Sequence, residues 1–186
     1  MATQPQTGLT YEDLRRFPED NLRRELIGGD LIVTAAPSTR HQDVVVTLVG
    51  LLLTHSQRHG GKVYPAPTDV YFSDRDVVEP DVVFVRADHV DRVEQRFIRS
   101  APDVVVEVSS PSTRALELRR KKDLYEENSV PEYWYVDLEA DRLEVYRLES
   151  GRYPAPVVLR RGESFESVAL PQLTVLVDDL LGRLED

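Results

Sequence analysis

A strand that must be buried on both faces limits most strongly how this chain can fold. Residues 101 to 113 read APDVVVEVSSPST, a β-branched run between Pro102 and Pro111. Valines in continuous sequence, without polar alternation, are typical of a strand covered on both faces. Glu107 interrupts the run, and a buried carboxylate costs several kcal/mol unless a cation or hydrogen-bond donors meet it. The rest of the chain must therefore supply a partner for Glu107.

Length and composition favour one α/β domain. The chain has 186 residues, 41% of them hydrophobic and 30% charged, which suits one hydrophobic core. We expect residues 1 to 9 to be a flexible tail and residues 10 to 186 to form the domain. The absence of cysteine excludes disulfides and thiolate metal sites. Because the sequence shows no membrane-spanning run and MATQPQTG does not resemble a signal peptide, we expect a cytoplasmic protein without membrane contact.

The net charge of −10 argues against a protein that coats nucleic acid nonspecifically, because Lys and Arg contacts to phosphates dominate such binding. Any binding to DNA must then be local. The segment TRALELRRKK, residues 113 to 122, carries five basic side chains against the single acid Glu117. On its own this segment also fits a solvated basic helix face.

Local patterns predict alternating helices and strands. Thr10 and Asp13 indicate a capping box for a helix through Phe17, and Ser38 is a good N-cap for a helix through His59. The remaining expected elements are a hairpin of RRELI and DLIVTA about a Gly-Gly turn, strands in KVYPAPTDVYFS and VVEPDVVFV joined by SDRD, an irregular link over 88 to 98, the strand 103 to 109, a helix from Ser112 or Thr113 to Asn128, a hairpin of EYWYVD and RLEVYRLE, and short strands before a C-terminal helix in VDDLLGRLED.

The helix expected over 39 to 59 is unusually apolar. Its segment VVVTLVGLLL is hydrophobic almost all round, which is not typical of a helix with one face in water. It must be covered by the sheet and the C-terminal helix, or lie in part at a two-fold interface. The interface version predicts a dimer.

Two acids on consecutive strands suggest a cation site. Asp81 follows Pro80 at the start of one expected strand, and Glu107 lies in the middle of the next. If these strands are antiparallel neighbours, their carboxylates are roughly 5 Å apart and can hold one cation. Oxygen ligands favour Mg²⁺ or Mn²⁺ over zinc. Alternatively, Asp81 is only a strand-start acid and Glu107 forms a buried ion pair with an arginine.

A basic helix after such a pair completes the set of groups that metal-assisted phosphodiester cleavage requires: carboxylates for the metal, and a lysine for the developing charge. The pattern of Pro80-Asp81 and Glu107-Val108-Ser109 resembles the PD-(D/E)XK nuclease superfamily, with serine in place of the motif lysine. Through ELIGGDLIV, PSTRHQ, PTDVYFS, EPDVVFV, KKDLY and VPEYWYVD, residues 10 to 180 resemble the Uma-type restriction endonuclease family (DUF820).

This resemblance implies an α/β (α+β) fold with a restriction-endonuclease-like core and a central mixed β-sheet flanked by helices. It also implies Mg²⁺ or Mn²⁺ as cofactor and a homodimer or larger homo-oligomer. Asp81 and Glu107 resemble the metal ligands and catalytic acids of such nucleases. A lysine of the KK pair resembles the motif lysine that Ser109 does not supply. Glu25, in ELIGGDL, resembles the auxiliary acid that these nucleases take from an N-terminal element, although it also fits an exposed strand acid.

Helical geometry distinguishes the two lysines. At about 100° per residue, Leu118, Leu124 and Tyr125 lie within about 60° of Lys121, which is therefore at the centre of the apolar stripe. Lys122 lies at the edge of the stripe. We expect Lys121 to face Glu107 as the third catalytic residue, and Lys122 to stay solvated and assist by contacting phosphate.

Other polar residues are secondary candidates. His41, in the first turn of the long helix, either donates to a phosphate or caps and packs. Asp69, in PTDVYFS, either adds an acid to the site or bonds a neighbouring turn. His55 and His59 have the i, i+4 spacing of a zinc pair but no third ligand, so a solvated helix end is the better interpretation.

The function that this pattern favours is a metal-dependent endonuclease that hydrolyses DNA phosphodiester bonds and contacts DNA through the basic segment from Arg114 to Lys122. Two alternatives stay open. The acidic net charge and the missing motif lysine also fit a catalytically inactive module for binding or assembly. The acidic surface also suits a metal-dependent hydrolase of small phosphorylated substrates.

Overall fold

The structure, a computed structural model, describes residues 7–18, 20, 22–34, 36–109 and 117–182. The helical elements in this part of the chain are α1 (Tyr11–Leu14), α2 (Thr39–His59), the 3₁₀ helix η1 (Ala87–Arg92), the π-helical turn η2 (Glu117–Lys121), α4 (Lys122–Glu127) and α5 (Val177–Leu181). The strands are β1 (Arg23–Ile27), β2 (Asp30–Thr34), β3 (Lys62–Pro65), β4 (Val70–Ser73), β5 (Asp76–Val78), β6 (Val82–Val85), β7 (Ile98–Arg99), β8 (Val104–Val108), β9 (Glu132–Asp137), β10 (Arg142–Arg147), β11 (Val157–Arg160), β12 (Ser164–Glu166) and β13 (Thr174–Leu176).

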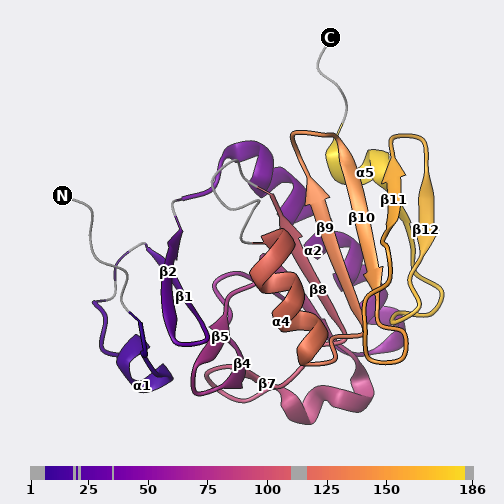
Figure 1. Cartoon of the computed structure of the whole chain (residues 1–186). Coiled ribbons are helices and arrows are strands. Elements are labelled where there is room, and N and C mark those ends of the chain that lie inside the picture. The colour runs from indigo at the N-terminus through magenta and orange to yellow at the C-terminus, as the bar shows by residue number, and fades with distance from the viewer. Residues whose placement is uncertain (1–6, 19, 21, 35, 110–116, 183–186) are drawn as a thin grey trace.

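A mixed six-stranded sheet forms the centre, in the order β11-β10-β9-β8-β6-β3. Its strands β8 to β11 are labelled in Figure 1. β8 pairs with β9 in parallel and with β6 in antiparallel orientation. A second sheet, β2-β1-β5-β4-β7, carries the N-terminal hairpin, and β12 pairs with β13. The expectation of a central mixed sheet flanked by helices is confirmed, and β8 is a central strand as its valine run predicts.

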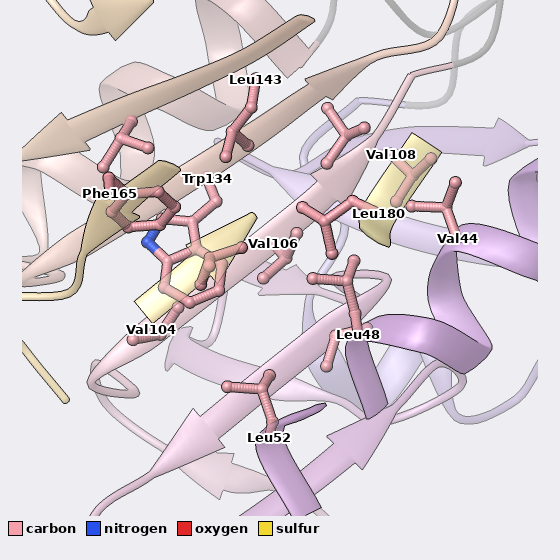
Figure 2. Close-up of a cluster of buried hydrophobic side chains, with 14 of the residues drawn as sticks. Val44, Leu48, Leu52, Val104, Val106, Val108, Trp134, Leu143, Phe165 and Leu180 are labelled. Carbon is pink, nitrogen blue, oxygen red and sulfur yellow. The ribbon is translucent and has the colours of Figure 1, made fainter. Parts of the chain in front are cut away.

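One face of the central sheet is covered by α2 and α5. Alternation along β8 turns Val104, Val106 and Val108 to this face, where they pack with Leu48 of α2 and Leu180 of α5 (Figure 2). Trp134 of β9 joins the same cluster. These residues are all at most 2% exposed, so this face is a dry hydrophobic core.

The opposite face is covered by α4 (Figure 1), and Ile27 and Ile32 of the β1–β2 hairpin pack in the hydrophobic cluster on this side. Glu107 of β8 and Lys121 also meet on this face. Val105 and the tyrosines Tyr133 and Tyr135 point to this face and pack with Tyr125 of α4. Glu107 shares the face of Val105, because side chains two residues apart on a strand point to the same side. The folding pattern thus places Glu107 under α4.

Most elements agree with the sequence patterns. The Gly28-Gly29 hairpin, the Ser38 N-cap and the Thr10 capping box are confirmed, although α1 ends at Leu14 and not at Phe17. The KVYPAPTDVYFS and VVEPDVVFV segments each divide into two strands, because Ala66-Pro67 and Pro80 interrupt them. The start expected for the next helix, Ser112 or Thr113, lies outside the described residues. None of the helices in the described ranges is long and apolar enough to cross a membrane.

Candidate active site

Asp81, the residue before β6, and Glu107 of β8 have their side chains on one face of the sheet. β6 and β8 are antiparallel, with Val82 opposite Val106. Asp81 precedes Val82 and Glu107 follows Val106, so the register places the two acids side by side. Asp81 Oδ2 also accepts a hydrogen bond of 2.7 Å from the Val108 amide. Both carboxylates are buried, and the antiparallel pairing expected from the sequence is present.

A third carboxylate, Glu25, reaches this face from β1. Its Oε1 accepts a hydrogen bond of 2.7 Å from the amide of Glu79, the residue before Pro80. Glu25 is 1% exposed, so the alternative of an exposed strand acid is wrong. Arg24, its neighbour, points to the other side of the strand and pairs with Asp20 at 2.6 Å. We call Glu25, Asp81 and Glu107 together the carboxylate cluster.

The Lys121 ammonium lies between two of these acids. Its Nζ is 2.8 Å from Glu107 Oε1 and 2.8 Å from Glu25 Oε1. Tyr125, one helical turn further, donates a hydrogen bond of 2.5 Å to the same Glu107 oxygen. Lys121 therefore faces the sheet, as helical geometry predicts, and its ammonium is one of the partners that a buried Glu107 requires.

The Arg23 guanidinium contacts all three acids. Nη1 is 2.7 Å from Asp81 Oδ1, whereas Nη2 is 3.4 Å from Glu25 Oε1 and 3.5 Å from Glu107 Oε2. The first distance is that of a strong charge-assisted hydrogen bond, and the other two are at the outer limit. The Arg23 Nε is buried without a partner among the described residues. The sequence alternative of an arginine partner for Glu107 is thus also present in the structure.

His41 anchors Asp81 from the first turn of α2. Ser38 caps the helix by accepting a hydrogen bond of 3.2 Å from the His41 amide, and His41 Nε2 lies 3.1 Å from Asp81 Oδ2. Burial opposes ionisation of Asp81, but the hydrogen bond from His41 and the charge of Arg23 outweigh it and hold the Asp81 pKa below its usual range. His41 therefore packs in the site and orients a carboxylate.

The surroundings of the cluster raise the pKa values of Glu107 and Lys121 and lower that of Glu25. Burial raises the pKa of Glu107, against the effect of Lys121, and the charge of Asp81 raises it further. Burial also acts on Glu25, but Lys121 and Arg23 outweigh it and lower the Glu25 pKa. For Lys121, the two glutamates outweigh burial and raise the pKa. The ammonium therefore stays charged at neutral pH and can stabilise negative charge, but it cannot accept a proton.

The donor chemistry of the cluster fits a hard divalent cation. Three carboxylates converge, and carboxylate oxygens are the ligands that Mg²⁺ and Mn²⁺ prefer. Among the described residues, however, no three His, Asp or Glu side chains are arranged so that they could hold one metal ion together. The cation that the three acids share is the Arg23 guanidinium, which leaves its own Nε unsatisfied. Asp81 and Glu107 would hold a metal in this place.

Two of the secondary candidates, Asp69 and Lys122, form no hydrogen bond or ion pair with the cluster among the described residues. Burial, and after it the charge of Glu25, raises the pKa of Asp69, so this carboxylate lies within electrostatic range of the cluster. Asp69 accepts a hydrogen bond of 3.4 Å from the Tyr11 hydroxyl. Lys122 pairs with Asp123 at 3.1 Å. Ser109, at the position of the motif lysine, accepts a hydrogen bond of 3.0 Å from the Leu138 amide, which links the ends of β8 and β9. The lysine of the site comes from the helix.

Three residues of the site were not singled out from the sequence. Arg23 and Glu25 are two residues apart on one strand, so an inward Glu25 implied an inward Arg23. Tyr125 lies one turn after Lys121 on the same stripe. Burial, reinforced by the nearby Asp69 carboxylate, raises the pKa of Glu79 to about 7. No pattern in the sequence indicated this shift.

The basic segment is only partly described. Arg114 lies outside the described residues, and Arg119 is exposed. Arg120 pairs with Asp30 at 2.9 Å and donates a hydrogen bond of 2.7 Å to the Ile27 carbonyl, which ties the helix to the β1–β2 hairpin. Part of this positive charge therefore holds the hairpin over the cluster.

His55 and His59 lie on the α2 side of the central sheet, away from the carboxylates. The two rings stack at 4.5 Å and border a hollow of about 300 Å³. His55 is buried, so the interpretation of both histidines as a solvated helix end is wrong for His55. No group of three metal-binding side chains includes them among the described residues.

Comparisons with known proteins agree with this fold. A solved structure, described as "a putative nuclease belonging to DUF820" from Anabaena variabilis ATCC 29413, superposes with a TM-score of 0.77 at 18% identity, over 93% of this chain and 97% of that chain. None of the curated proteins compared with the chain matches it. The model of the Uma2 family, described as "Putative restriction endonuclease", matches residues 11–178. The chain, whose cluster of acids and lysine lies within that range, therefore belongs to the Uma2 family.

Proposed function

We propose that this protein is a metal-dependent endonuclease that hydrolyses DNA phosphodiester bonds. The observation that carries the proposal is the meeting of Asp81, Glu107 and Lys121 in one buried cluster, with the Lys121 ammonium 2.8 Å from Glu107. Family membership supports the same reaction class. These three residues are the proposed catalytic set, with Glu25 and His41 as auxiliary residues.

Each residue of the set has a chemical task. A Mg²⁺ or Mn²⁺ ion held by Asp81 and Glu107 would polarise the phosphate and activate water. Lys121, whose raised pKa keeps it charged, stabilises the negative charge that develops on the phosphate. Glu25 fixes the position of Lys121 from the opposite side, and His41 fixes Asp81.

The proposed substrate is DNA, bound locally. The overall charge of −10 disfavours broad phosphate contact, so affinity must come from the basic residues beside the site. Arg119 is exposed and Lys122 lies at the edge of the stripe, where either can contact a phosphate. Asp69 lies within electrostatic range of Glu25, so we keep it as a secondary auxiliary acid.

Nicking of supercoiled plasmid in Mn²⁺ tests the proposal. The wild-type chain should nick the plasmid, and Glu107→Gln should not. If neither protein nicks plasmid but both retain the fold, the chain is instead an inactive binding or assembly module. This second function is favoured by one observation, namely that Arg23 and Lys121 already compensate the acids. Turnover of nucleotides without nicking would indicate a hydrolase of small substrates.

The proposed assembly is a homodimer formed by an exposed stripe of α2, made of Val46, Gly50 and Leu53. Val46 is 69% exposed and Leu53 is 45% exposed. The space beside the Gly50 Cα is open, because a Cβ atom placed there would have no neighbour within 4 Å. Asp43 and Arg58 flank the stripe, both exposed and without an ion-pair partner among the described residues. Antiparallel packing of two α2 helices about Gly50 would bring Asp43 of each chain to Arg58 of the other.

Sedimentation at micromolar concentration tests this interface. We expect a dimer for the wild-type chain and a monomer for Val46→Glu, because the substitution buries two charges in the two-fold interface. Val33→Glu is the matched control, since Val33 is an exposed valine on β2, away from α2. A wild-type monomer, or a Val46→Glu dimer, would contradict the proposed interface.

A further inference from the structure

We propose that Arg23 is a built-in competitor of the metal ion: its guanidinium occupies the cation position of the carboxylate cluster, and a divalent ion binds by displacing it. The inference rests on the proposed function, because it assumes that Asp81 and Glu107 are the metal ligands. It goes beyond that function by assigning a role to a residue that belongs to neither the acids nor the lysine.

Arg23 is placed where a shared cation must lie. It is the one side chain among the described residues that contacts all three acids of the cluster. Lys121 contacts Glu25 and Glu107 but not Asp81. A metal held by Asp81 and Glu107 must therefore enter the space that the guanidinium now fills, and the two cations cannot occupy it together.

The contacts of Arg23 are those of a replaceable occupant. One of its three carboxylate contacts is short, at 2.7 Å, while the others are 3.4 and 3.5 Å. Its Nε is buried with no hydrogen-bond partner among the described residues, which is costly for a charged group. By contrast, Lys121 makes two contacts of 2.8 Å to the same set of acids.

Arg23 is more exposed to solvent than the other charged side chains of the site. Its side chain is 21% exposed, whereas the side chains of Lys121 and the three acids are at most 3% exposed. Among the five charged side chains of the site Arg23 is the most exposed, so its outward rotation is the route that the proposed exchange would take. Lys121 is held by the apolar stripe of its helix and cannot leave in this way.

Charge favours the exchange. The cluster has three carboxylates against the two cations Arg23 and Lys121, so one negative charge is left uncompensated when all three acids are ionised. Exchange of the single charge of Arg23 for the double charge of a metal ion removes this deficit. Charge alone would therefore make the ion a better occupant, and Arg23 stabilises the cluster until an ion arrives.

Calorimetric titration with Mn²⁺ alone, on the full-length protein, tests the inference. If the outward state of Arg23 is a minor state, Arg23→Met should bind Mn²⁺ about tenfold or more tightly, because the apparent affinity falls with the population of the binding-competent state. Arg23→Lys, which keeps a positive charge, should bind more weakly than Arg23→Met. Arg24→Met is the matched control, since Arg24 points to the opposite side of β1 and should leave affinity unchanged.

A second readout separates competition from a merely structural role. In EDTA, Arg23→Met should melt below the wild-type temperature, because the acids lose a counter-charge. Saturating Mn²⁺ should close the gap. Equal Mn²⁺ affinity in Arg23→Met and wild type, with binding lost in Asp81→Asn, would overturn the inference and leave the proposed metal site intact. Absence of Mn²⁺ binding in every folded variant would overturn the metal site itself.

Discussion

Replacement of Glu79 by glutamine should stabilise the protein, and only above acidic pH. Glu79 is half-buried, directly before Pro80-Asp81, and its amide donates to Glu25. Burial first, and then the Asp69 carboxylate, raise its pKa to about 7 from an ordinary 4.5. Arg23 opposes the shift, Glu25 adds to it and Lys121 opposes it. The balance makes the charged form of Glu79 unfavourable in the folded chain.

The sign and size follow from proton linkage. The folded state keeps the Glu79 proton up to about pH 7, whereas the unfolded chain releases it near 4.5. The folded state therefore binds more protons, so the contribution of Glu79 to stability is present below pH 4.5 and is lost as pH rises to 7. The shift corresponds to about 3 kcal/mol, and partial exposure reduces this to about 2 kcal/mol. Glutamine stays neutral and avoids this loss.

Urea unfolding in EDTA at pH 5 and pH 8, followed by fluorescence, measures this effect. Trp134 is the only tryptophan and is fully buried, so it reports on the core. The stability of Glu79→Gln relative to wild type should increase by about 2 kcal/mol between the two pH values. Glu25→Gln is the contrasting control: the lowered Glu25 pKa predicts destabilisation at pH 8. A pH-independent difference for Glu79→Gln would refute the linkage argument.

Two further predictions address catalysis. Asp81→Asn and Glu107→Gln should each abolish Mn²⁺ binding in calorimetry, and unchanged affinity in both would rule out the proposed metal site. Lys121→Ala should eliminate Mn²⁺-dependent plasmid nicking, whereas Lys122→Ala should only weaken it, more so at high salt, because a phosphate contact is screened by ions. The opposite ranking of the two lysines would contradict the assignment.

The two acid variants should differ in stability. Relief of like-charge repulsion would predict that both keep or raise stability. The structure supports this for Glu107, whose pKa is raised, but not for Asp81, whose lowered pKa shows that the folded chain favours its charge. Asp81→Asn should therefore lower the urea midpoint at pH 7 and Glu107→Gln should not. Equal midpoints for both variants would contradict this distinction.

Sequence patterns predicted the central strand and the direction in which Lys121 points. The valine run of residues 103 to 109 predicts a central strand, and the apolar stripe about Lys121 predicts an inward ammonium; both are observed. These predictions succeed because each depends on one element alone. A side chain on a strand or helix has few possible directions once the buried face is known.

Periodicity could not predict which hairpin covers the sheet. Arg23 and Asp81 are 58 residues apart, and no local pattern indicates that β1 lies over β6 and β8. The contact depends on packing between two sheets, which Arg120 supports by binding the hairpin. For the same reason the pKa shift of Glu79 was not predictable, since it comes from burial and from Asp69, the residue before β4.

The buried Glu107 is compensated by two cations with different freedom to move. Lys121 is 1% exposed and is fixed by its helix, so it compensates the charge of Glu107 whether or not a metal ion is bound. Arg23 is 21% exposed, at the rim, and its contact with Glu107 is longer, at 3.5 Å. A chain that kept three buried acids for stability alone would gain from replacing them with apolar residues, because buried ion pairs are often no better than hydrophobic packing. The retained acids with one anchored and one replaceable cation therefore favour a site built to exchange a cation over a purely structural cluster.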